Sequence, residues 1–128
     1  MNLLLDTRTF LWLTSEPAHL STKATEAIND ESNVIYLSDA SVWEICLKWQ
    51  AGKYRLPNPP RDWCEEQIET WKLMPLPIGR SHMFRVTELP THHKNPFDRL
   101  LVAQALEERL SIVTPDAHIK RYPVSVLW

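Results

Sequence analysis

The sequence predicts an α/β domain that has a central, mainly parallel sheet with helices on both faces. Short apolar runs, among them residues 3–5 and 34–37, alternate with longer segments of helical pattern. An unbroken apolar run is typical of a strand buried on both faces. Strands that alternate with helices favour a parallel sheet with right-handed crossovers.

Length and composition narrow the class of protein. A chain of 128 residues predicts a single domain, residues 1–128, and its 44% hydrophobic content is enough for one packed core. No apolar stretch reaches the roughly 18 residues of a membrane span, and Asp6 interrupts the apolar start, so we expect a cytoplasmic protein. The two cysteines, Cys46 and Cys64, are expected to be free and to pack as small hydrophobes.

Local signals place the elements. Asn95 is expected to cap a helix that begins at Pro96 and carries Asp98 in its first turn. Proline in residues 73–76 predicts an edge strand there. The remaining expected strands are residues 2–5, 34–37, 111–114 and 124–127, and the remaining expected helices are residues 7–13, 22–28, 38–51, 61–71 and 80–89.

Four acids occupy positions from which they can meet. Asp6 and Asp116 follow strands, Glu44 lies in the helix after the second strand, and Asp98 opens a later helix. The carboxyl ends of parallel strands share one edge of the sheet, where ligands bind. Because clustered carboxylates repel one another, a divalent cation is expected among them, and Mg²⁺ or Mn²⁺ prefers such oxygen ligands.

Each acid also has a structural explanation. Ser41 and Glu44 match a capping box, and Glu44 with Lys48 matches a helix-surface ion pair. Asp98 would complement the helix dipole, and Asp116 would cap the turn at residue 117. A functional role is favoured for Asp6, because an acid that ends a buried strand is costly unless it is paired or binds a metal.

Other groups carry weaker signals. His92 and His93 are interpreted as an exposed loop, since no partner stands at zinc spacing. The six tryptophans are interpreted as core or subunit-contact residues rather than as a base-stacking platform. The net charge of −2 means that contact with a nucleic acid depends on a local basic face. Candidate members of such a face are Lys48, Lys53, Arg55, Lys94, Arg99 and Arg109.

Several motifs together carry a resemblance to a known family. They are residues 3–7, residues 41–45 with Lys48, residues 96–101, and residues 113–114 with Asp116. In this order and spacing, along the whole chain, they resemble the PIN-domain toxins of the VapC family. The resemblance implies a three-layer PIN-like fold and an endoribonuclease that depends on Mg²⁺ or Mn²⁺. It also implies a homodimer that is inhibited by a VapB-like antitoxin.

By matching motif, the resemblance assigns the catalytic metal site to Asp6, Glu44, Asp98 and Asp116. Two positions depart from the pattern: relatives often carry histidine where this chain has Arg8, and aspartate where it has Asn95. Arg8 puts a fixed positive charge near Asp6, which would either steer a phosphate or weaken metal binding. The candidate substrate-binding residues are Arg8, Lys48 and Arg99.

The leading hypothesis is a ribonuclease toxin that cleaves single-stranded RNA by water attack on a phosphodiester. A different class stays open, namely a catalytically weakened PIN-like module that acts only by binding protein. A phosphatase with an aspartyl nucleophile at Asp6 is disfavoured, because Arg8 stands where that chemistry needs a second aspartate.

Overall fold

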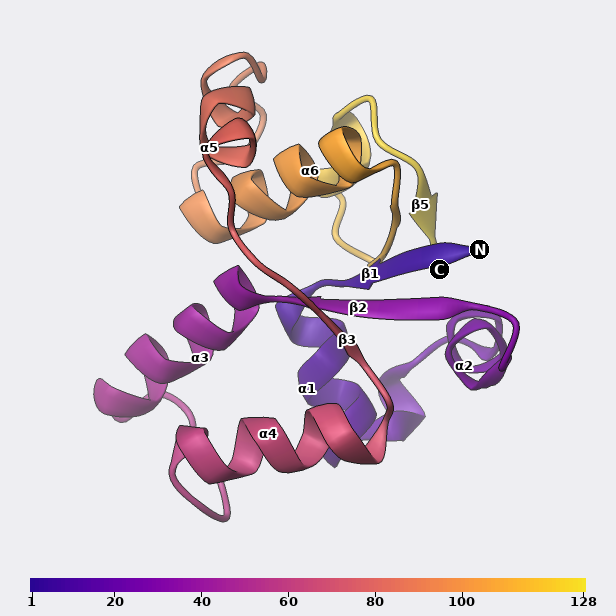
Figure 1. The fold of residues 1–128 in the computed structure, drawn as a ribbon, viewed down its shortest axis with the longest axis vertical. Helices are drawn as coiled ribbons and strands as arrows, with labels where there is room; N and C mark the ends of the chain where they lie inside the picture. Colours follow the sequence, from indigo (N-terminus) through magenta and orange to yellow (C-terminus); the bar gives the residue numbers. More distant parts are fainter.

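The computed structural model describes residues 1–128, which form one five-stranded sheet between two groups of helices (Figure 1). The strand order is β3-β2-β1-β4-β5, and every neighbouring pair is parallel. The predicted parallel α/β class is therefore confirmed. The strands are β1 (Asn2–Leu5), β2 (Val34–Ser38), β3 (Met74–Leu76), β4 (Ser111–Val113) and β5 (Val126–Leu127).

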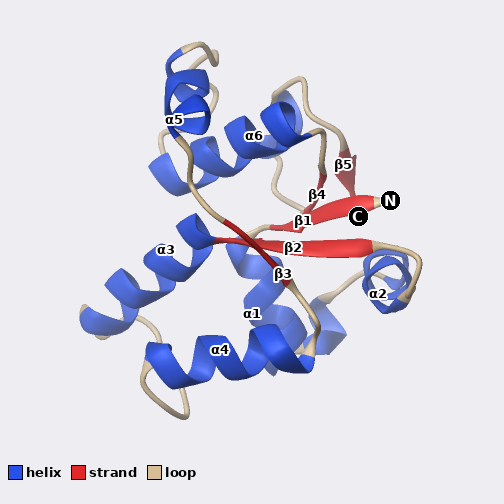
Figure 2. Cartoon of the chain, viewed as in Figure 1, coloured by secondary structure: helices blue, strands red, loops and turns tan.

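The helices follow the predicted order along the chain (Figure 2). They are α1 (Thr7–Ser15), α2 (Thr22–Asn29), α3 (Asp39–Gln50), α4 (Pro60–Thr70), α5 (Arg80–Thr87) and α6 (Pro96–Glu108). Two short 3-10 turns span Pro17–His19 and Ile119–Arg121, and the first of these was not predicted. No helix has both the length and the apolarity to cross a membrane.

Strand β1 shows why the apolar runs are unbroken. Leu3 and Leu5 point into a core shared with α1, α2 and α4, whereas Leu4 points into a second core shared with α6. All three leucines are fully buried. Figure 1 shows α1, α2 and α4 on one side of the sheet and α6 on the other.

Most predicted boundaries agree with the structure to within a few residues. Met74–Leu76 is an edge strand, as expected from Pro75, and Cys46 and Cys64 are both free. The expected strand at residues 124–127 is shorter, because the Val124 N–H donates to the carbonyl of Tyr122 instead of joining the sheet. Because β1 and β2 are parallel neighbours, Asp6 and the start of α3 lie at the same edge of the sheet.

Candidate active site

Asp6 lies at the carboxyl end of the central strand β1 and caps α1. One carboxylate oxygen accepts the Thr9 N–H at 2.7 Å, and the other accepts the hydroxyl of Thr114, at the end of β4. Only 5% of Asp6 is exposed, and this burial raises the pKa of its carboxyl although the hydrogen bonds oppose the shift. An acid in this place is costly unless positive charge is near.

Glu44 reaches the same edge from α3. Its Oε1 accepts the Thr7 hydroxyl at 2.7 Å, its Oε2 lies 2.6 Å from the Lys48 ammonium, and only 3% of the residue is exposed. The capping-box interpretation is wrong, because Ser38 rather than Ser41 caps α3. The ion pair with Lys48 is present, but it lies within the site and not on an exposed helix surface.

Lys48 is held in place by this acid. Burial disfavours its charged form, but the hydrogen bond to Glu44 and the charge of Glu44 prevail and raise the pKa of Lys48. The ammonium also lies 5.4 Å from the centroid of the Tyr54 ring. Lys48 is therefore a charged neighbour of Glu44 at neutral pH.

Asp98 lies in the first turn of α6, as the sequence predicts. The side chain of Asn95 caps the helix by accepting the N–H groups of Phe97 and Asp98 at 2.9 and 3.4 Å. Burial raises the pKa of Asp98 to about 6, and the charges of Asp6 and Glu44 contribute to this rise, while a hydrogen bond from His93 opposes it. Asp98 therefore lies within electrostatic reach of both acids.

Asp116 follows β4 and has two roles. Its Oδ1 accepts the N–H groups of His118 and Ile119 at 2.7 and 3.2 Å, which confirms the predicted cap of the following turn. Its own N–H donates to Thr114 at 3.0 Å, which fixes the loop beside Asp6. The capping role does not remove Asp116 from the acidic group, since it also lines the same cavity.

The four acids face one small cavity of about 80 Å³, which we call the acidic cavity. Its lining comes from four separate parts of the chain and consists of Asp6, Thr7, Arg8, Glu44, Lys48, Tyr54, Asn95, Asp98 and Asp116. Carboxylate and amide oxygens around so small a space match the ligands of a hard divalent cation. The predicted convergence of the four acids is present.

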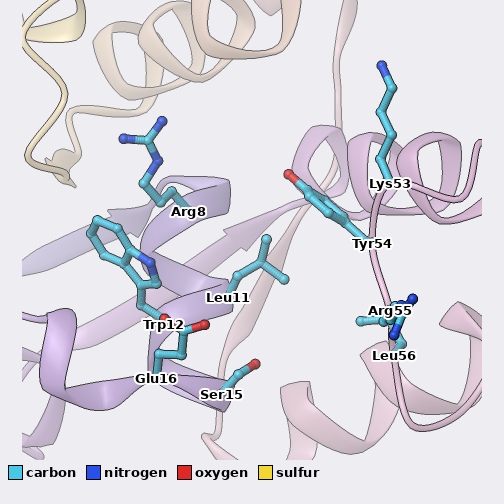
Figure 3. A pocket seen from close by; sticks show the side chains of 9 residues that line it. All are labelled: Arg8, Leu11, Trp12, Ser15, Glu16, Lys53, Tyr54, Arg55 and Leu56. Atoms are coloured by element: carbon cyan, nitrogen blue, oxygen red, sulfur yellow. The ribbon is translucent and has the colours of Figure 1, made fainter.

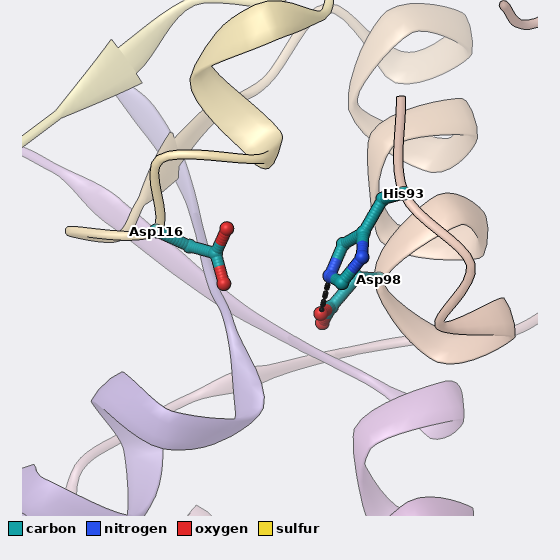
Figure 4. Close-up of side chains that lie close together, drawn as sticks. All are labelled: His93, Asp98 and Asp116. Atoms are coloured by element: carbon teal, nitrogen blue, oxygen red, sulfur yellow. Dashed lines mark hydrogen bonds and ion pairs between the residues drawn. The ribbon is translucent and has the colours of Figure 1, made fainter. Parts of the chain in front are cut away.

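His93 belongs to this region, although the sequence was interpreted as an exposed loop there. Its Nε2 lies 2.8 Å from Oδ2 of Asp98, and possible ligand atoms of His93, Asp98 and Asp116 all lie within 4.8 Å of one another (Figure 4). Its ring stacks on His118, with centroids 4.8 Å apart. The one sequence signal was its position just before the capped helix that carries Asp98.

The three candidate phosphate-binding cations differ in their surroundings. Arg8 and Lys48 line the acidic cavity, but Arg99 does not. The Arg99 guanidinium donates to the carbonyls of Val86 and Pro90 at 2.9 and 3.0 Å and to the Tyr122 hydroxyl at 3.1 Å. Arg99 thus joins α6 to the end of α5 and lies outside the acidic cavity, and its role as a substrate-binding residue stays a prediction.

Comparison with known proteins gives one family. A family model described as "PIN domain" matches residues 3–124. Ribonuclease VapC16 of Mycobacterium tuberculosis is 28% identical over 102 residues, which cover 78% of this chain and 67% of that protein. Ribonuclease VapC22 of the same organism is 27% identical over 128 residues, which cover 96% of each chain.

Solved structures share the fold along nearly the whole chain. VapBC2 from Rickettsia felis, bound to a promoter DNA fragment, matches with a TM-score of 0.71 at 18% identity, covering 98% of this chain and 97% of that one. DNA-bound VapBC from Salmonella typhimurium gives a TM-score of 0.71 at 16% identity, covering 98% and 96%. Such low identities establish likeness of fold alone.

Proposed function

The chain belongs to the PIN-domain family, and from that premise we propose that it is a Mg²⁺- or Mn²⁺-dependent endoribonuclease, the toxin of a type II toxin–antitoxin pair. In this proposal residues 1–128 act as one PIN-like domain. The relatives named ribonucleases support the activity, and the likeness to VapBC structures supports a VapB-like antitoxin as partner. One observation carries the chemistry: four carboxylates from distant parts of the chain face a cavity of about 80 Å³.

The donor set fits a hard divalent cation. Asp6, Glu44, Asp98 and Asp116 offer carboxylate oxygens and no thiolate, which favours Mg²⁺ or Mn²⁺ over a softer metal. Burial raises the pKa of Asp6 and of Asp98, and the neighbouring acids raise the pKa of Asp98 further, so a bound cation would favour the ionised form of both. We assign these four residues as the metal ligands, and a bound cation would activate water and stabilise charge on the phosphodiester.

Neighbouring side chains orient the acids. The hydroxyls of Thr7 and Thr114 hold Glu44 and Asp6, and the imidazole of His93 holds Asp98. Such contacts fix carboxylates before a ligand arrives, which reduces the cost of ordering them during binding. Arg8 and Lys48 bring positive charge to the cavity wall, where they would bind the phosphate of the substrate.

The decisive experiment measures cleavage of single-stranded RNA by the wild type and by Asp6→Asn, with Mg²⁺, with Mn²⁺ and with chelator. We expect cleavage only with metal and a loss of at least about a hundredfold in the variant, since one charged ligand is removed. Metal titration by calorimetry should show weaker binding for Asp6→Asn and Glu44→Gln. Thermal melting in chelator should show that both variants stay folded.

The alternative class, a module that only binds protein, gives the opposite result. The ion pair between Lys48 and Glu44 is the observation that favours it, because Lys48 already supplies positive charge at 2.6 Å. If the wild type cleaves no RNA and shows no heat of metal binding, the ribonuclease proposal fails. If Asp6→Asn still cleaves RNA, the assignment of the four acids as the catalytic metal ligands is wrong.

A further inference from the structure

A second hollow adjoins the acidic cavity, and we call it the basic hollow. It lies between α1 and residues 53–56, which connect α3 to α4 (Figure 3). Arg8, Leu11, Trp12 and Ser15 line its α1 side, at a spacing that puts all four on one face of the helix. Its volume of about 380 Å³ is within the range of small-ligand sites and is enough for one nucleoside.

The walls of the basic hollow suit a flat, partly apolar group. Trp12 and Leu11 lie on the α1 side, and Tyr54 and Leu56 lie on the facing segment (Figure 3). Nucleobases stack on aromatic side chains without strong dependence on sequence. The hollow therefore offers surfaces on which a base can be held.

The charge of the basic hollow is opposite to that of the acidic cavity. Arg8, Lys53 and Arg55 line it, and Glu16 is its one acid. Glu16 lies 2.7 Å from His19, whereas none of the three basic side chains forms an ion pair. In a chain of net charge −2, this hollow is a local basic face of the kind that contact with a polyanion needs.

The two sites are continuous. Arg8 and Tyr54 line both the basic hollow and the acidic cavity. A strand with one phosphate at the four acids would therefore meet Arg8 next and then enter the hollow. Figure 3 shows the Arg8 and Tyr54 side chains on opposite sides of the opening.

We propose that the basic hollow is a nucleotide subsite that binds a single-stranded RNA residue adjacent to the scissile phosphate. The base lies against Tyr54, because the Trp12 ring is already stacked on His19 and has the Arg8 guanidinium over it, and a flanking phosphate lies at Lys53 and Arg55. This inference rests on the proposed ribonuclease function. It adds residues that would bind the substrate and that do not contribute to metal binding.

RNA suits the pair of sites better than a peptide does. A peptide that matched the basic hollow would be acidic, and the four carboxylates next to it would repel that charge. An RNA strand presents the same phosphates and bases to both sites, with a cation between the phosphate and the acids at one of them. The geometry therefore favours a ligand that repeats the same phosphate and base groups along its length.

The test measures binding of a short, mixed-sequence, fluorescent single-stranded RNA in chelator, so that cleavage does not interfere. The double variant Lys53→Gln/Arg55→Gln changes two exposed side chains and should stay folded. We expect its affinity to fall at least about tenfold at low salt. The slope of log affinity against log salt should flatten by about 0.7, which corresponds to the loss of one neutralised phosphate. The matched control is Lys23→Gln, an exposed lysine of α2 that lines neither site; it should bind almost as the wild type does.

A second pair of variants tests the stacking role. Tyr54→Phe keeps the ring and removes the hydroxyl that accepts from Lys48, so RNA affinity should be kept. Tyr54→Ala removes the ring and should weaken binding by at least about fivefold. Equal affinity of wild type, Tyr54→Ala and the double variant would overturn the subsite and leave the hollow to a protein partner. Failure of the proposed function is distinguishable, because then the wild type itself cleaves no RNA with either metal.

Discussion

The Nε2 atom of His93 lies 2.8 Å from the Oδ2 atom of Asp98, so the loop before α6 holds the acid in the first turn of that helix. A carboxylate at a helix N-terminus is ordinarily stabilised by the helix dipole. Here burial raises the pKa of Asp98 to about 6, with help from the charges of Asp6 and Glu44. The cost of burying this carboxylate, with the repulsion from Asp6 and Glu44 added to it, thus exceeds the stabilisation from the dipole and from His93.

Replacement of Asp98 by Asn should therefore stabilise the metal-free protein. The pKa is raised in the folded state, so the folded protein binds this proton more tightly than the unfolded chain does. Stability from this group is present at low pH and is lost as pH rises through about 6. At pH 7 in chelator, Asp98→Asn should raise the free energy of unfolding by on the order of 1 kcal/mol and so melt at a higher temperature. The relieved cost of the buried charge exceeds a lost dipole contribution of roughly 0.3 to 1 kcal/mol.

Two controls accompany the melting curves. At pH 4 most of the Asp98 carboxyl is protonated, so the difference between variant and wild type should shrink. Added Mg²⁺ should stabilise the wild type more than the variant, because a ligand that binds only the folded state raises its stability. If the variant melts at a lower temperature than the wild type in chelator and is stabilised equally by Mg²⁺, then Asp98 only complements the helix dipole.

Metal affinity should depend on pH through the same carboxyl. A cation needs Asp98 ionised, so binding competes with a proton whose pKa is about 6. Calorimetric titration with Mn²⁺ should show affinity that rises as pH increases from 5 to 6 and then levels off near pH 7. In Asp98→Asn the rise of Mn²⁺ affinity between pH 5 and pH 7 should be lost. An equally steep rise in the variant would mean that another group controls binding.

His93 should strengthen metal binding through Asp98. Its hydrogen bond lowers the pKa of Asp98, so His93→Ala should raise that pKa further and weaken Mn²⁺ binding at pH 6.5 by several fold. His92→Ala is the matched control, because the His92 ring packs against Tyr122 and not against an acid. Equal Mn²⁺ affinity in the two variants would limit His93 to packing with His118.

The acids of the site could be predicted from sequence because each obeys a local rule. Asp6 ends an apolar run and Asp98 follows a capping Asn and a Pro, and parallel strands bring such positions to one edge. The contacts that orient the acids could not be predicted. Thr114 meets Asp6 across 108 positions, and no local pattern encodes that pairing.

The differences between expectation and structure have physical causes of the same kind. Arg99 is adjacent to Asp98 in sequence, but its guanidinium donates to the carbonyls of Val86 and Pro90 and does not line the acidic cavity. Ser38, and not Ser41, caps α3, because β2 ends at Ser38 and the helix begins directly after it. Side-chain direction and strand length are properties of the packed structure.

The last prediction concerns self-association through α3. Trp43 is 55% exposed and Leu47 is 42% exposed, one helical turn apart, and Phe97 packs against Trp43 with ring centroids 5.3 Å apart. Large apolar side chains that share an exposed face are typical of a subunit contact, and we expect a second copy of this chain to cover them.

Light scattering at micromolar concentration should therefore give a dimer for the wild type and a monomer for Leu47→Glu, because a charge buried without a partner in the contact costs several kcal/mol. Met74→Glu is the matched control: Met74 is 50% exposed on the edge strand β3, so this variant carries the same charge on a comparable side chain away from α3. It should remain a dimer. A wild type that is monomeric throughout would rule out the contact, and a dimer that survives Leu47→Glu but not Met74→Glu would move it to the β3 edge of the sheet.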